Sequence, residues 1–82
     1  MGEEKEIGRV AHYFSKIGVA VVELSDTLSV GDTIHIKGAH TDFQQEVKSM
    51  QIEHEDIEKA GAGQSIGLKV KKRVRENDAV YK

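Results

Sequence analysis

The stretch VAHYFSKIGVAVVEL, residues 10–24, contains two runs of strand-forming residues with a tight connection between them. The runs span residues 10–14 and 19–24, and both are rich in the β-branched and aromatic residues that favour β-structure. In the second run the apolar positions recur with a period of two, at Ala20, Val22 and Leu24. This spacing places them on one face, so the stretch predicts two short strands joined by a turn.

The same alternation continues along the rest of the chain. Turn-forming residues separate further short runs, whose inward-facing residues are Ile34 and Ile36, then Ile66, Leu68 and Val70, with a last short strand at 79–81. Residues 57–64 contain two glycines and are expected to form a loop. An all-β fold follows, and closure of the sheet removes its exposed edges. We therefore expect a small, closed, six- to seven-stranded antiparallel β-barrel, with a β-sandwich as the other usual arrangement.

The alternation changes phase once. The core-side positions are first odd-numbered and then even-numbered: Phe43, Gln45 and Val47, then Met50 and Ile52. A period-two strand cannot bury both sets unless one extra residue is inserted. We therefore expect one long, bent strand with a β-bulge near Lys48 and Ser49.

The size and composition indicate one soluble domain. The chain has 82 residues, enough for one domain, and it has no cysteine, so disulfides are excluded. Its formal net charge of −2 gives no general attraction to nucleic acid. No apolar run behind the charged start could act as a signal peptide, and none reaches the ~18 residues that a membrane span needs, so we expect neither. We expect a flexible charged N-terminus at residues 1–5, a single barrel at 6–82, a cytoplasmic location and no membrane contact.

Four segments carry a resemblance to a known family when they are taken in order. They read IGRV at 7–10, LSVGDTI at 28–34, AGAGQSIGL at 60–68 and RENDAV at 75–80. Their order and spacing resemble domain II of the elongation factor Tu and initiation factor 2 class of GTPases, over residues 6–82. The resemblance implies a β-barrel that works as a binding module and contacts RNA or the ribosome.

The resemblance does not extend to nucleotide or aminoacyl-tRNA binding. A phosphate-binding loop needs Gly-x-x-x-x-Gly-Lys-Ser/Thr, and the glycines of 61–64 lack the lysine and the following helix, so no GTP is expected. The positions that correspond to the pocket for the aminoacylated end of tRNA all depart from the family pattern: Gln51, Glu53, His54 and Ser65.

Residues 10–22 are also similar to a stretch of the C-terminal barrel of U32 peptidases, which is an accessory domain and not the catalytic part of those proteins. This second resemblance implies the alternative function, a protein-interaction module that recruits a larger enzyme or forms an oligomer. The candidate interaction residues are His12, Tyr13 and Lys16, beside Phe14 and Ile17.

The best candidate for nucleic-acid contact is a group of five cations: Lys69, Lys71, Lys72, Arg73 and Arg75. Three of them, Lys69, Lys71 and Arg73, share strand parity, and such a stripe can neutralise phosphates. Aromatic residues for base stacking are scarce. The other interpretation is a solvated strand that pairs with the acidic stretch 53–58 across the sheet.

No pattern indicates catalysis. His12 and His35 can lie on adjacent strands, but a zinc site needs three or four converging ligands, so all four histidines, including His40 and His54, are expected on the surface. The serines show no Gly-x-Ser-x-Gly motif. We expect a non-catalytic chain without metal or cofactor that binds RNA, a ribosome or a protein partner.

Overall fold

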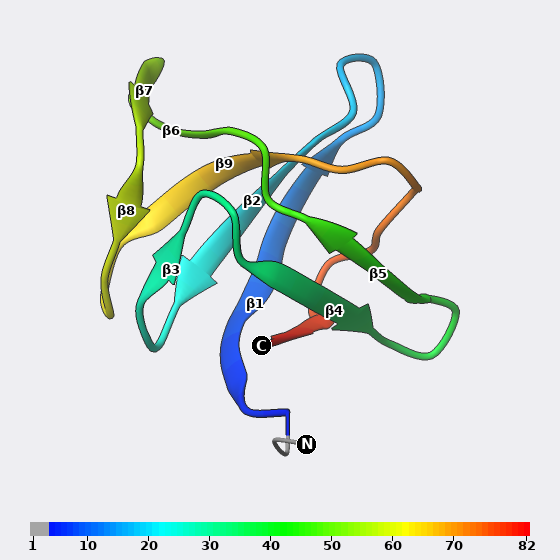
Figure 1. Ribbon diagram of the computed structural model, residues 1–82. Coiled ribbons are helices and arrows are strands. Elements are labelled where there is room, and N and C mark those ends of the chain that lie inside the picture. Colours follow the sequence, from blue (N-terminus) through cyan, green and yellow to red (C-terminus); the bar gives the residue numbers. More distant parts are fainter. Residues whose placement is uncertain (1–3) are drawn as a thin grey trace.

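The computed structural model describes residues 4–82 and is all-β, with every strand pair antiparallel (Figure 1). Its ten strands are β1 (Glu6–Phe14), β2 (Val19–Leu24), β3 (Leu28–Ser29), β4 (Thr33–Lys37), β5 (Asp42–Glu46), β6 (Met50–Ile52), β7 (Glu55–Ile57), β8 (Lys59–Ala60), β9 (Ser65–Lys69) and β10 (Ala79–Tyr81). Eight strands form one curled sheet in the order β5-β4-β10-β1-β2-β9-β6-β7, and β3 pairs with β8 in a second. The predicted all-β fold is confirmed.

The long hairpin of β1 and β2 is the centre of the sheet. β1 pairs with β10 on one side and with β2 on the other, and its register shifts between Glu6 and Gly8 and again between Val10 and His12. Such bulges bend a strand and increase its twist, which lets the sheet curl around its core. Gly8 is required at the first bend, because a Cβ there would lie 2.8 Å from the carbonyl oxygen of Glu23.

The core is a single cluster of apolar side chains on the concave side of the curled sheet. Alternate residues of β2, β4 and β9 supply much of it, as the period of two predicts. Its fully buried members include Leu28, Ile34, Ile36, Ile66 and Leu68.

The prediction of a closed six- to seven-stranded barrel is wrong. β5 and β7 stand at the two ends of the sheet order and do not pair with each other, so the sheet is an open, curled half-barrel. Side-chain contacts take the place of a strand ladder beside β5, where the amide of Gln45 bonds to the backbone at Lys69 and Lys71. The Val30 N–H donates to the Glu58 carbonyl at 2.8 Å and extends the β3–β8 pairing.

The prediction of a β-bulge near Lys48 and Ser49 is also wrong. The chain leaves strand conformation after β5, which pairs with β4, and re-enters it at β6, which pairs with β9 and β7. The Val47 N–H donates to the Asp32 carbonyl and the Val47 carbonyl accepts from the Gly31 N–H, both at 2.8 Å, which fastens the crossing point. The two sets of apolar residues therefore belong to two separate strands, and both can be buried.

Two further expectations concern the segments outside these strands. Residues 57–64 were expected to be a loop, but they contain the end of β7 and all of β8. Of the predicted flexible segment 1–5, residues 1–3 lie outside the described part of the chain. Lys5 exchanges two backbone hydrogen bonds with Lys82, at 3.0 and 2.9 Å. Within residues 4–82 there is no helix long and apolar enough to cross a membrane.

Candidate functional site

The turn between β1 and β2 exposes two large apolar side chains. Phe14 is 46% exposed and Ile17 is 62% exposed. The turn itself is well fastened: the Gly18 N–H donates to the Phe14 carbonyl at 2.9 Å, and the Gly18 carbonyl accepts from the Val70 N–H at 2.9 Å. Gly18 has a φ of 67°, a conformation that glycine adopts without strain. A rigid tip with exposed apolar side chains is suited to contact with another macromolecule.

Two of the candidate interaction residues, His12 and Tyr13, lie at the base of this tip. The ring of His12 meets the ring of Phe14 edge-on at 4.5 Å between centroids, and its Nδ1 lies 3.2 Å from a carboxylate oxygen of Glu76. Tyr13 is half-buried and packs against the core, whereas Lys16 is exposed in the turn. His12 therefore connects the tip to the segment between β9 and β10.

The five basic residues do not form one strand stripe. β9 ends at Lys69, and the other four lie in the connection to β10, so the shared parity of Lys69, Lys71 and Arg73 does not place them on one face. The buried side chain of Val74 holds this connection against the core. All five cations are nevertheless exposed, and in the described chain none has a carboxylate oxygen within 4.0 Å. The Lys72 ammonium lies 5.9 Å from the centre of the Phe43 ring.

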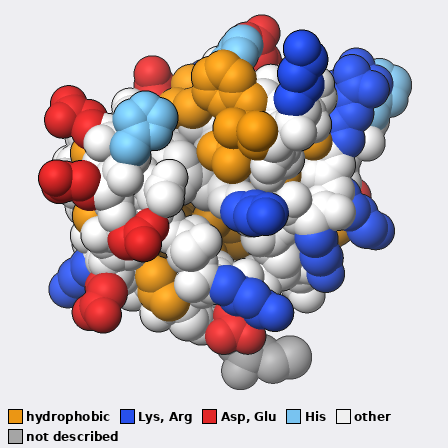
Figure 2. Space-filling view, turned by 90° about the horizontal axis from the view of Figure 1, so that it is seen from above, with side chains coloured by type: hydrophobic (Ala, Val, Ile, Leu, Met, Phe, Trp, Pro, Cys, Tyr) orange, Lys and Arg blue, Asp and Glu red, His pale blue; other side chains and the backbone are white. Residues whose placement is uncertain are grey.

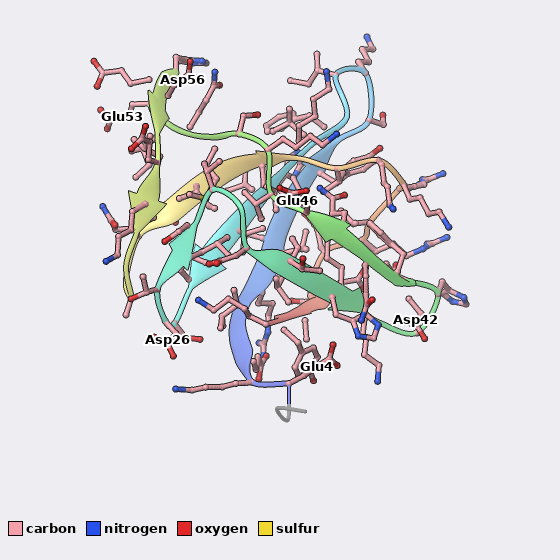
Figure 3. All side chains as sticks on the ribbon, in the orientation of Figure 1. Glu4, Asp26, Asp42, Glu46, Glu53 and Asp56 are labelled. Carbon is pink, nitrogen blue, oxygen red and sulfur yellow. The ribbon has the colours of Figure 1, made fainter. Side chains whose placement is uncertain are left out.

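The other interpretation, that the strand with these cations pairs with the acidic stretch 53–58, is also wrong. β9 pairs with β2 and β6, and the acidic residues of 53–58 lie on β7 and its turns, beyond β6. Figure 3 shows Glu53 and Asp56 at the β6–β7 hairpin, well away from Asp42 at the start of β5. The acidic and basic side chains are therefore separated on the surface. Figure 2 shows one face, on which hydrophobic side chains gather between a mainly acidic side and a mainly basic side.

Most of the predicted site residues line one of two clefts. One, of about 580 Å³, joins the two predicted sets, because it is lined by His12 and Tyr13 together with Arg73 and Arg75. The other, of about 360 Å³, lies where the half-barrel is open between β5 and the end of β9. It is lined by Gln45, Glu46, Lys48, Ser49, Lys69, Val70 and Lys71. Lys72 and Lys16 line neither cleft.

The histidines do not assemble a metal site. β10 lies between β1 and β4, so the prediction that His12 and His35 can occupy adjacent strands is wrong. His35 instead lies between two carboxylates, with Nδ1 2.8 Å from Glu4 and Nε2 2.5 Å from Asp42. The hydrogen bond to Asp42 raises the pKa of His35, burial opposes the rise, and Glu4 adds to it. Among residues 4–82 no three histidine or carboxylate side chains gather as metal ligands.

The comparisons with solved structures identify the fold. A selenomethionine variant of the C-terminal domain of a putative U32 peptidase from Geobacillus thermoleovorans superposes with a TM-score of 0.91, covering 95% of this chain and 99% of that one, at 22% identity. A second crystal structure of that domain gives a TM-score of 0.87 at 22% identity, covering 93% of this chain and 89% of the other. The chain has the fold of a U32 peptidase C-terminal domain.

The curated relatives that match the chain are named as a protease and as collagenases. The chain is 49% identical over 77 residues, 93% of its length, to an uncharacterized protease of Methanocaldococcus jannaschii. It is 40% identical over 78 residues to a collagenase of Porphyromonas gingivalis. It spans only about a fifth of these relatives, 19% and 22% of their lengths. No family model matches the chain. The U32 resemblance is thus supported, whereas the resemblance to translation-factor domain II stays a prediction.

Gln45 is the most informative of the cleft residues that sequence reasoning missed. Gln45 was placed on the core side of its strand, between Phe43 and Val47, but it is half-exposed in the opening of the barrel. The available signal was a polar side chain at a position whose neighbours of the same parity are apolar. Its role depends on Lys69 and Lys71, 24 and 26 residues away in the chain, which no local pattern connects to it.

Proposed function

We propose that this chain is a non-catalytic accessory module of the U32 peptidase type, which binds a protein partner through the exposed tip of the β1–β2 hairpin. The observation that carries the proposal is its 49% identity to one segment of a much longer protease, a segment that makes up 19% of that protein. About four fifths of the protease has no counterpart in this chain, and this small share supports an accessory role.

The exposed tip supports the choice of binding surface. Phe14 and Ile17 leave a large part of their apolar area in contact with water, and covering it on association is favourable. One backbone hydrogen bond closes the turn between Gly18 and Phe14, and another joins Gly18 to Val70. Little ordering is therefore needed when a partner binds. Lys16 and His12 place a polar rim around this apolar centre, as is usual for protein interfaces.

A titration tests the proposal. The partner is the Methanocaldococcus jannaschii protease with its matching segment deleted, and the intact protease is the control whose own segment competes. We expect the chain to bind the deleted form, and the double variant Phe14→Ser/Ile17→Ser to bind roughly tenfold or more weakly. Val30→Ser is the matched control, because Val30 is 39% exposed but lies outside the tip. Equal binding by the three forms of the chain would remove the tip from the proposal.

RNA contact is the second candidate function, favoured by one observation. The cations at 69–75 are exposed, and none of them has a carboxylate partner in the described chain, so they are available to phosphates. It predicts that binding of total tRNA or ribosomal subunits weakens steeply with salt and is lost in Lys69→Glu/Lys71→Glu/Arg73→Glu. Unchanged RNA affinity in this triple variant would reject it.

A further inference from the structure

The opening of the half-barrel contains an unusual hydrogen-bond arrangement. The Gln45 side chain donates from Nε2 to the Lys69 carbonyl at 2.9 Å and accepts at Oε1 from the Lys71 N–H at 3.0 Å. In a parallel β-ladder, the peptide groups of one residue make this pair of bonds with the two residues that flank its partner. The Gln45 amide therefore occupies the position of a backbone segment paired with Val70.

Past Leu68 this edge of β9 has no neighbouring strand within residues 4–82. Val70 bonds to Gly18 on the β2 side, so the Lys69 carbonyl and the Lys71 N–H point to the opposite edge. On that edge the pairing with β6 stops at Leu68, which is opposite Met50. Beyond this point, in the part of the chain that the structure describes, the Gln45 side chain is the partner of the Lys69 carbonyl and the Lys71 N–H.

We propose that the cleft between β5 and β9 binds an extended acidic peptide segment, which displaces the Gln45 amide and pairs with the backbone of residues 69–71. The proposal goes beyond the proposed function by naming a second contact and the chemistry of its ligand. The cleft holds about 360 Å³ and contains two backbone groups with the spacing that an added strand requires.

Charge selects the kind of peptide. The lining residues include three lysines, Lys48, Lys69 and Lys71, against one carboxylate, Glu46. Figure 3 shows Glu46 at the end of β5, where the chain turns toward β6. An extended segment whose alternate residues are acidic can place its carboxylates near the lysines while its backbone pairs with β9.

The backbone groups favour a peptide over a phosphate diester. The Lys71 N–H can donate to a phosphate or to a peptide carbonyl. The Lys69 carbonyl needs a donor, which a peptide N–H supplies and a phosphate diester does not. A phosphate that displaces Gln45 therefore leaves the Lys69 carbonyl without its bond.

The test is an NMR titration of the whole chain with a terminally blocked peptide of alternating glutamate and valine, about six residues long, the usual length of a strand. We expect shifts at the Lys71 N–H and the Gln45 side-chain amide. In Gln45→Ala the peptide should bind roughly tenfold tighter, because two hydrogen bonds no longer have to be broken first. Gln45→Met, which keeps a side chain of similar length without either hydrogen bond and adds no charge, should also bind more tightly and covers the case in which the alanine variant does not fold.

Charge reversal supplies the specificity control. Lys69→Glu/Lys71→Glu should weaken the acidic peptide at least tenfold, whereas Lys72→Glu/Arg75→Glu, the same change outside the cleft, should have little effect. Equal binding of a lysine–valine peptide would overturn the proposal, as would unchanged or weaker binding by Gln45→Ala. Shifts at Lys71 produced by oligouridine and not by the peptide would overturn it in favour of RNA.

The outcome is separable from that of the proposed function. The same variants can be titrated against the deleted protease, whose binding is assigned to the tip at Phe14 and Ile17. Protease binding with no peptide binding would reject the cleft and leave the accessory module in place. Peptide binding without protease binding would reject the tip, and the absence of both would reject both.

Discussion

The carboxylate of Asp78 lies in the space that a Cβ atom on Gly38 would occupy. An ideal Cβ at Gly38 is 1.9 Å from Oδ1 of Asp78 and 2.6 Å from its Cγ. Asp78 is only 5% exposed, and it accepts a hydrogen bond from the Arg75 N–H at 2.9 Å, so the carboxylate has little freedom to move away. The pair joins the loop after β4 to the segment that carries the basic residues.

Replacing Gly38 with alanine should therefore destabilise the fold. We expect Gly38→Ala to lower the free energy of unfolding by about 1–3 kcal/mol, the usual cost of overpacking. Urea denaturation followed by circular dichroism measures it. Gly61→Ala is the matched control, because a Cβ there has only the Gln64 Oε1 nearby, at 4.0 Å. Equal losses in the two variants would contradict the contact.

The same contact predicts coupling between the two positions. Asp78→Ala alone should cost about 1–3 kcal/mol, because it leaves the Arg75 N–H without its partner. In that background Gly38→Ala should cost much less than in the native chain, because the obstructing carboxylate is gone. A double-mutant cycle of unfolding free energies measures the coupling, and strictly additive losses would show that the residues do not interact.

The β6–β7 turn is built from residues that rarely adopt its conformation. Glu53 and His54 have φ values of 51° and 67°, the left-handed region that type I′ hairpin turns require at both central positions. Replacing them with asparagine and glycine should raise the free energy of unfolding by about 1 kcal/mol. Lys48→Asn/Ser49→Gly, at positions without a positive φ, should give no gain. A gain of the same size there would contradict the explanation.

Stability should depend on pH through His35. Its pKa is raised in the fold, mainly by Asp42, so its contribution is fully present below its ordinary pKa near 6.5 and is lost as the pH rises through the raised value. Urea midpoints should therefore fall as the pH rises from about 6.5 through the raised pKa. His35→Gln should reduce this fall, and His40→Gln, at an exposed histidine, should not. The same slope in all three proteins would contradict the assignment.

The opposite change is expected at low pH. Contact with His35 lowers the pKa of Asp42, so the contribution of Asp42 is present above the ordinary value near 3.8 and is lost as the pH falls through the lowered value. The ion pair is therefore complete between these limits, near pH 5. Asp42→Asn should remove most of the loss on the alkaline side as well, because His35 then loses its main partner.

The individual strands could be predicted from the sequence, because alternation is a local property. The pattern at Ile34 and Ile36, and at Ile66 and Leu68, gave strands whose buried faces the structure confirms. Whether the sheet closes is a global property. The phase change between Val47 and Met50 is compatible with a bulged strand or with two strands, and only the backbone bonds of Val47 to the 31–32 turn decide between them.

The candidate site was predictable to a smaller extent. The sequence gives residue types, so it identified the cations at 69–75 and the hairpin at 12–16 separately. It does not specify that His12 and Arg73 line one cleft, or that Lys69 and Lys71 line another with Gln45. These groupings depend on how the segment between β9 and β10 returns across the sheet, and the buried Val74 that holds it is not part of a strand pattern.

The most direct test of the accessory-module account is hydrogen–deuterium exchange of the chain, alone and with the deleted Methanocaldococcus jannaschii protease. The account predicts slower exchange on binding at residues 12–18, around the exposed Phe14 and Ile17, with the β6–β7 turn unchanged. Unchanged exchange at the tip, with protection confined to other strands or absent from the whole chain, would contradict it.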